Sequence, residues 1–304
     1  MKTLSFEAIQ ELMPYRFPMQ LIDRIKIDSE THAVGMKALS FNDLVFQGHF
    51  PGHPIMPGVM QVEAMQQVAA ILLKDKFDPT GTRDIYIKKI KKVKFRKPAL
   101  PGDRLLIDVN IDSIDGDEAV ITAFNTSNSG VTCQVSMTLS VRDRTCNLTF
   151  PEEFNDVDKG ENTEMDVTEI MNVIPHRFPF LFIDYISSVD GSDVVAVKNI
   201  TGTEPFFHGY TPDYAVLPGA VQVEIIAQAG CVHTLLRPEN KGKIAYFMSI
   251  SDVEYFAPVR PGDQLKIEVA IPAGGSRFGK GTGTITVDGN IASRGSIAFA
   301  LVEE

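Results

Sequence analysis

Two stretches of the chain are apolar at almost every position. The first begins near Gly58 and continues through Val59, Met60 and Val62 toward Leu73, and a similar run begins at Gly219. A helix without a polar face is typical of a protein core, so we expect two buried helices. A proline precedes each glycine and marks the place where each helix begins.

Short helical patterns and β-rich segments surround both apolar stretches. We expect helices at 5–12 and 167–173 and extended segments at 21–27 and 194–200. β-rich runs then follow each apolar helix, at 85–95, 104–111, 119–126 and 131–141, and at 245–256, 264–271, 281–288 and 291–302. This order predicts an α+β fold in which an antiparallel sheet wraps around a central helix.

The chain contains the same unit twice. MPYRFPMQLIDRI at 13–25 matches IPHRFPFLFIDYI at 174–186, and KPALPGDRLLIDV at 97–109 matches APVRPGDQLKIEV at 257–269. Such self-similarity indicates a tandem duplication. An acidic stretch with few apolar residues separates the copies, which predicts one domain at 1–145, a linker at 146–165 and a second domain at 166–304.

Composition excludes several classes of function. The formal net charge of −10 argues against a general nucleic-acid binder. Cys133, Cys146 and Cys231 are too few and too scattered for a disulfide framework or a thiolate zinc site. The N-terminus does not resemble a signal peptide, and no apolar run is long enough to span a membrane, so we expect a cytoplasmic protein. Nothing in the sequence calls for a cofactor or a metal.

Two residue types in and before the apolar helices carry candidate chemistry. Burial would raise the pKa of Glu63 and Glu224 and favour the protonated, proton-donating form, unless each carboxylate faces solvent through a gap. His49 has the right chemistry for a base near neutral pH, although a lone histidine beside Phe50 is more often structural.

The helix starts and a metal site offer further alternatives. Gly58 and Gly219 could direct free N–H groups at an oxyanion, or could simply begin their helices. A metal site made by His49, His53 and Glu63 is disfavoured, because the prolines around the two histidines prevent a shared helical face.

The motif GHFPGHPIMPGVMQVEAMQQ at 48–67, together with 13–25 and 174–186, resembles the FabZ-type 3-hydroxyacyl-[acyl-carrier-protein] dehydratases. The resemblance covers both copies. It implies a hotdog fold in each copy, a double hotdog in the whole chain, and sites in which a histidine of one hotdog faces a glutamate of the other. It also implies an acyl carrier protein as partner and a place in fatty-acid biosynthesis.

The second copy departs from this pattern, because GHFPGHPIMPG becomes GYTPDYAVLPG and Tyr210 replaces the histidine. Tyrosine, with a reference pKa near 10, is a poor base at neutral pH. If the copies share sites as the resemblance implies, one competent site combines His49 and Glu224 with the helix start at Gly219. The other, degenerate site combines Tyr210, Glu63 and Gly58.

The resemblance implies that His49 removes the α-proton, that Gly219 stabilises the enolate-like charge, and that Glu224, protonated or holding a water, assists loss of the 3-hydroxyl as water. The product would be a trans-2-enoyl thioester. Basic residues concentrated at 88–97 offer a docking surface for the carrier protein, or a strand that keeps its charges in solvent: Lys88, Lys89, Lys91, Lys92, Lys94, Arg96 and Lys97.

Several other functions remain open from the sequence. The chain could serve a polyketide or polyene route, isomerise its product as FabA relatives do, act as a hotdog thioesterase, or bind acyl thioesters without catalysis. Glutamate at positions 63 and 224 resembles the FabZ type more than the isomerising type. Further assembly of double hotdogs into a homo-oligomer is also possible.

Overall fold

The computed structural model describes residues 1–144, 163–210, 214–272 and 277–303, except for the side chain of Tyr210. The first half contains β1 (Lys2–Leu4), α1 (Phe6–Leu12), β2 (Arg24–Ile27), β3 (His32–Ala38), α2 (Val45–Gly48), α3 (Gly58–Phe77), β4 (Arg83–Phe95), β5 (Arg104–Asp115), β6 (Glu118–Ser127) and β7 (Gly130–Asp143). The second half contains β8 (Met165–Asp166), α4 (Val167–Met171), β9 (Tyr185–Asp190), β10 (Asp193–Asn199), α5 (Pro205–Tyr210), α6 (Gly219–Leu235), a 3₁₀ turn η1 (Pro238–Asn240), β11 (Lys243–Tyr255), β12 (Gln264–Ala270), β13 (Phe278–Val287) and β14 (Asn290–Glu303).

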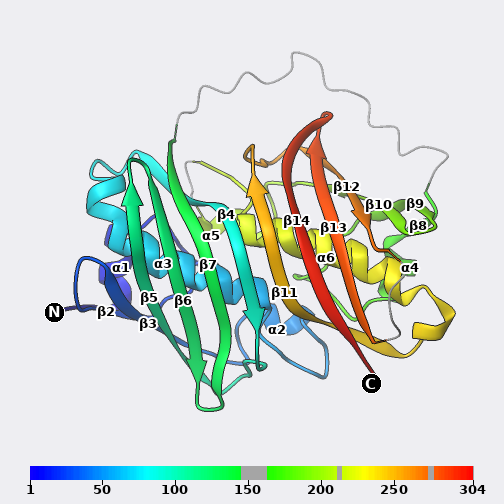
Figure 1. Cartoon of the computed structure of the whole chain (residues 1–304), viewed down its shortest axis with the longest axis horizontal. Helices are drawn as coiled ribbons and strands as arrows, with labels where there is room; N and C mark the ends of the chain where they lie inside the picture. Colours follow the sequence, from blue (N-terminus) through cyan, green and yellow to red (C-terminus); the bar gives the residue numbers. More distant parts are fainter. Residues whose placement is uncertain (145–162, 211–213, 273–276, 304) are drawn as a thin grey trace.

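The described strands form one continuous sheet of 14 strands (Figure 1). Their order is β1-β2-β3-β5-β6-β7-β4-β11-β14-β13-β12-β10-β9-β8, so the second half repeats the first half in reverse about the β4–β11 pair. That pair is antiparallel, with Lys94 opposite Ser249 and Lys89 opposite Glu254. The expected α+β double hotdog is therefore confirmed.

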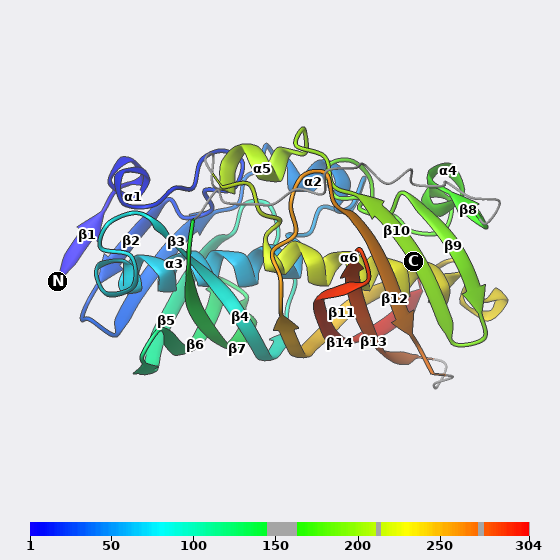
Figure 2. The same cartoon turned by 90° about the horizontal axis from the view of Figure 1, so that it is seen from above.

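The long helices α3 and α6 lie one after the other across the same face of the sheet (Figure 2). Both are buried along most of their length, as their lack of a polar face predicted. Small residues in the sheet allow close packing: a Cβ atom on Gly35 would lie 2.4 Å from Val68 of α3, and one on Gly283 would lie 2.3 Å from Ile226 of α6. Each helix therefore belongs to the core of its own half.

The two halves also exchange contacts through their Arg-Phe-Pro turns. The backbone N–H of Arg177 donates to the carbonyl of Gly48 at 3.0 Å, and the N–H of Arg16 donates to the carbonyl of Gly209 at 2.6 Å. A Cβ atom on Gly48 would lie 2.0 Å from the Arg177 carbonyl oxygen, so only glycine fits this crossing. The turn that carries His49 is thus held against the second half.

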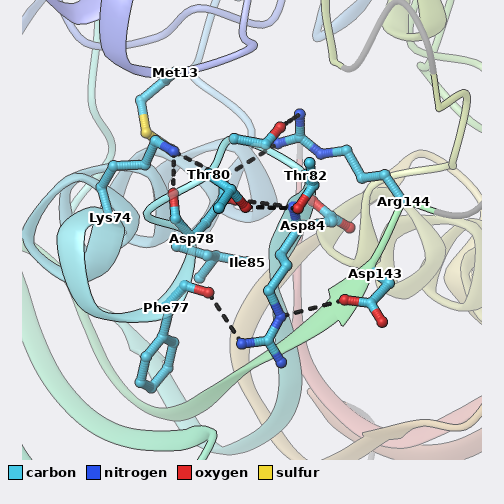
Figure 3. A network of polar contacts seen from close by, with 12 residues as sticks. Met13, Lys74, Phe77, Asp78, Thr80, Thr82, Asp84, Ile85, Asp143 and Arg144 are labelled. Atoms are coloured by element: carbon cyan, nitrogen blue, oxygen red, sulfur yellow. Dashed lines mark hydrogen bonds and ion pairs between the residues drawn. The ribbon is translucent and has the colours of Figure 1, made fainter.

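A polar network fixes the C-terminal end of α3 (Figure 3). The Lys74 ammonium pairs with the Asp78 carboxylate at 2.9 Å, and the other oxygen of Asp78 accepts the N–H of Arg83 at 2.8 Å. The Arg144 guanidinium lies 3.9 Å from the same carboxylate. The helix end, the start of β4 and the end of the first half are therefore tied together.

Some elements differ from those expected. The sequence did not indicate β1, β3, β8, β9, α2 or α5. Most of the expected linker, 146–165, lies outside the described residues, so the domain boundaries stay a prediction. Within the described ranges, none of the helices has both the length and the apolar character needed to cross a bilayer.

Candidate active site

A cavity of about 370 Å³ opens where the two halves meet. The first half contributes His49 and Gly58 to its wall, and the second half contributes His176 and Glu224. Its remaining lining residues are Phe50, His53, Ile55, Met56, Gln61, Phe95, Arg96, Lys97, Pro98, Ala227, Gln228, Cys231, Ala245, Tyr246, Phe247, Ile297 and Phe299. The structure therefore places His49 and Glu224 in the same cavity, as expected.

His49 directly follows the short helix α2 and is oriented by its own loop. Its Nδ1 lies 2.8 Å from the carbonyl oxygen of Ile55. A carbonyl only accepts hydrogen bonds, so Nδ1 carries the proton and the lone pair is on Nε2. Burial, and then the neighbouring His176, lower the pKa of His49 to about 4. The ring is therefore neutral near pH 7 and can accept a proton.

Glu224 lies on α6 with one oxygen held and the other without a partner. Its Oε1 accepts from the Gln228 amide at 2.9 Å and lies 3.3 Å from His176 Nε2, whereas Oε2 has no hydrogen-bond partner among the described residues. Burial alone would raise the pKa of Glu224, but the hydrogen bond and charge of His176, with smaller effects of His49 and Gln228, lower it below its ordinary value. The expectation of a protonated Glu224 is therefore corrected: the carboxylate is ionised.

His176 was not identified as a site residue from the sequence. It is buried in the turn after α4, and its ring meets that of His49 at a centroid distance of 5.6 Å. The first copy has Tyr15 at this position. A comparison of the two copies could have identified it, because each copy has a histidine at only one of the two positions. The first copy has His49 but Tyr15 in place of His176, and the second copy has His176 but Tyr210 in place of His49.

The assignment of helix starts to cavities is also corrected. Gly58 lines the cavity of His49 and Glu224, whereas Gly219 lines a second pocket with Glu63. The reason is helical geometry: five residues advance the direction of a side chain by about 140° around the axis, so Gly58 and Glu63 of one helix face different cavities. Each site therefore combines the helix start of one half with the glutamate of the other.

The second pocket is nearly filled, with a volume of about 20 Å³. The Arg142 guanidinium lies 4.3 Å from the centre of the Tyr86 ring and pairs with the Asp84 carboxylate at 2.7 Å. The Tyr255 hydroxyl donates to the Gly219 carbonyl at 2.7 Å. The main chain of Tyr210 ends α5, but its side chain lies outside the described residues.

Glu63, in this second pocket, behaves as the sequence predicted for a buried carboxylate. It accepts a hydrogen bond from the Gln67 amide at 3.0 Å, as Glu224 does from Gln228. Burial raises its pKa to about 7, partly offset by that hydrogen bond. The two glutamates have equivalent amide partners and opposite pKa shifts, because two histidines, His176 above all and His49, lower the pKa of Glu224.

The basic residues expected to dock a carrier protein fall into three groups. Lys88 pairs with Glu118, and Lys89 lies 3.4 Å from Glu254 of the neighbouring half. Arg96 and Lys97 line the large cavity and are exposed, so they lie at its mouth. The remaining members, Lys91, Lys92 and Lys94, lie along β4.

A metal site made by His49, His53 and Glu63 does not form in the described structure, because Glu63 lies in the other pocket. Among the described residues, the three groups close enough together for a metal are His49, His176 and Glu224, whose ligand atoms lie within 4.8 Å of one another. The same three groups are the candidates for acid–base chemistry.

Comparison with known proteins shows similarity along both halves. The FabA-like domain matches residues 13–134 and again 174–296. The chain is 44% identical over 138 residues to 3-hydroxyacyl-[acyl-carrier-protein] dehydratase FabZ of Bacillus cereus and to FabZ of Bacillus thuringiensis, in each case covering 45% of this chain and 96% of the relative.

Solved structures match the double unit as a whole. The dehydratase domain from the CurJ module of curacin polyketide synthase has a TM-score of 0.62 at 12% identity, covering 96% of this chain and 98% of that one. The PpsC dehydratase domain of Mycobacterium tuberculosis has a TM-score of 0.59 at 13% identity, covering 93% and 98%. A protein of Lactobacillus plantarum provisionally named an oleoyl thioesterase has a TM-score of 0.59 at 11% identity, covering 90% and 98%. At these identities the structures establish the fold alone.

Proposed function

The chain belongs to the family of FabA-like domains, with one such domain in each half, and we propose that it dehydrates 3-hydroxyacyl thioesters of acyl carrier protein to trans-2-enoyl thioesters at a single composite site. The observation that carries this proposal is the shared cavity in which His49 of one half faces Glu224 of the other. Its volume of about 370 Å³ contrasts with about 20 Å³ around Glu63.

The first step is removal of the α-proton. His49 is neutral and has its lone pair on Nε2, because Nδ1 donates to Ile55. Nε2 takes a proton from the α-carbon, and negative charge develops on the thioester oxygen. The start of α3 at Gly58 lines the same cavity and offers N–H groups and the positive end of the helix dipole to that oxygen.

The second step is departure of the 3-hydroxyl. The ionised Glu224 attracts the imidazolium formed on His49, and its Oε2, unpartnered among the described residues, accepts a hydrogen bond from the hydroxyl. The imidazolium then gives its proton to the hydroxyl oxygen, the bond from that oxygen to the β-carbon breaks, and water leaves. The α-proton and the hydroxyl together account for the lost water, so His49 returns to its neutral form.

Arg96 and Lys97 support a carrier protein as the donor of the substrate. They lie at the cavity mouth in a chain of net charge −10, where an acidic carrier would meet them. Lys88 and Lys89 are already paired with carboxylates, so their contribution is smaller.

The experiment is a product analysis with 3-hydroxyacyl carrier protein. We expect an enoyl thioester to accumulate with the wild-type chain and to be absent with His49→Ala, whose melting temperature is measured as a control for folding. Release of free carrier thiol without enoyl product would identify a thioesterase. Binding without either product would identify a non-catalytic module, and both results would contradict the proposal.

A further inference from the structure

The large cavity continues along α6 beyond the reacting groups. Ala227, Gln228 and Cys231 follow Glu224 at spacings of three, four and seven residues, so they share its helical face, and all of them line the cavity. Seven residues correspond to about 10 Å along a helix axis. The wall therefore extends well past the position of the 3-hydroxyl.

The opposite wall of this extension is apolar. It is formed by Ala245 and Phe247 of β11 and by Ile297 and Phe299 of β14. The charged lining residues are Arg96 and Lys97, which are exposed, and Glu224, which precedes this part of α6. The extension thus matches an aliphatic chain attached to the thioester.

The position of Phe299 in this wall depends on a glycine on the neighbouring strand. Gly279 of β13 lies opposite Phe299 in the sheet, and a Cβ atom on Gly279 would lie 2.2 Å from the phenyl ring. The corresponding pair in the first half is Ala119 opposite Leu139. Leu139 is smaller than phenylalanine and leaves room for the Cβ atom of Ala119 on the neighbouring strand, whereas the phenyl ring of Phe299 requires a glycine opposite it.

We propose that Phe299, seated on Gly279, together with Cys231 on the facing helix, sets the length of acyl chain that the site accepts. This inference rests on the proposed function, because an acyl chain enters the extension only when its thioester lies between His49 and Glu224. Short chains end before Cys231, whereas longer chains reach the phenyl ring.

Two substitutions move this wall in opposite directions. Phe299→Leu introduces the residue of the first half and enlarges the cavity. Gly279→Ala pushes the ring off the strand and into the cavity, because the ring lies between them. Leu301→Val is the matched control: Leu301 is on the same strand, is as buried as Phe299, and does not line the cavity.

The readout is the ratio of kcat/KM for 3-hydroxydecanoyl to that for 3-hydroxybutyryl carrier protein. We expect Phe299→Leu to raise this ratio about tenfold and Gly279→Ala to lower it by a similar factor, the scale on which pockets discriminate methylene groups. Leu301→Val should leave it unchanged. The ratio is insensitive to a uniform loss of folded protein, which melting curves monitor separately.

Cys231 supplies a second readout that does not depend on turnover. In a Cys146→Ser background, its modification by methyl methanethiosulfonate is followed by mass spectrometry at about pH 9, because burial raises the pKa of its thiol to about 12. Decanoyl carrier protein at about ten times its Kd should slow this modification about tenfold. Butyryl carrier protein should not, and Cys133, buried away from the cavity, is the internal control.

The outcomes separate this inference from the proposed function. If the wild-type chain dehydrates its substrates, but both variants keep the wild-type ratio and decanoyl carrier protein leaves Cys231 unprotected, the length-setting role of Phe299 is wrong and the dehydratase stands. If no chain length is dehydrated, the proposed function is wrong, and protection of Cys231 still tests where the acyl chain lies.

Discussion

Replacing His176 with tyrosine, the residue of the first copy, tests why the two buried glutamates differ. Without the histidine, Glu224 would stay buried but lose the strongest influence that lowers its pKa, and burial raises the pKa of the equivalent Glu63 to about 7. The pKa of Glu224, which lies below its ordinary value, should then rise toward that of Glu63. For Glu63, the rise from 4.5 to about 7 corresponds to roughly 3 kcal/mol in the free energy of protonation, which is the scale expected for the change at Glu224. The proposed reaction uses Glu224 in its ionised form.

The assay is the pH dependence of kcat/KM together with a carbon-13 NMR titration of the Glu224 carboxyl group. In the wild type, the pKa of Glu224 lies below its ordinary value and His49 stays neutral down to about pH 4, so activity should change little between about pH 6 and pH 8. In His176→Tyr, activity near pH 6 should fall about tenfold relative to pH 8, because Glu224 is then largely protonated.

Tyr15→Phe is the matched control in the first half, because the proposed reaction does not use Glu63. It should keep the wild-type pH profile. An unchanged Glu224 titration in His176→Tyr would refute the claim that His176 sets the charge of this carboxylate. If the pH profile of activity shifted to the same extent in both variants, the cause would be a general effect on the fold.

Three further predictions concern the other pocket, the mouth and the pair of copies. Glu63→Gln should stabilise the fold by roughly 3 kcal/mol near pH 8 and by almost nothing near pH 4, as measured by urea unfolding at both pH values. The reason is that the pKa of this carboxyl is raised to about 7 in the folded state, so ionising it costs stability as the pH rises above its pKa in the unfolded chain. Charge reversal of Arg96 and Lys97 should raise KM for the carrier-bound substrate and weaken its salt dependence, with no effect on a small thioester analogue; equal losses on both substrates would argue against docking. His49→Ala should abolish dehydration while Tyr210→Phe keeps most of it, and loss of activity in the tyrosine variant alone would reverse the assignment of the two sites.

Much of the fold followed from the sequence because its signals are local. The absence of a polar face placed α3 and α6 in the core, and alternating runs placed β4 to β7 and β11 to β14. β1 and β8 were not apparent because they are two or three residues long and pair at the sheet edges. Short segments of this kind carry too few residues for a periodic signal.

The site was only partly predictable, because its geometry depends on how two distant helices meet. The resemblance implied that His49 and Glu224 share a cavity. Which helix start lines that cavity depends on the different directions in which Gly58 and Glu63 face from the same helix. The charge of Glu224 depends on His176, which is 48 residues away in sequence and 3.3 Å away in space. Burial alone predicted the pKa of Glu63 correctly and that of Glu224 with the wrong sign.

The most direct test of a single composite site is kcat/KM for 3-hydroxyacyl carrier protein in Glu224→Gln and in Glu63→Gln. The two glutamates have equivalent positions on their helices and the same glutamine partner, so the variants are matched. We expect Glu224→Gln to lose at least about 100-fold and Glu63→Gln to stay within about twofold of the wild type. Equal losses in both variants, or a loss confined to Glu63→Gln, would contradict the composite site of His49 and Glu224.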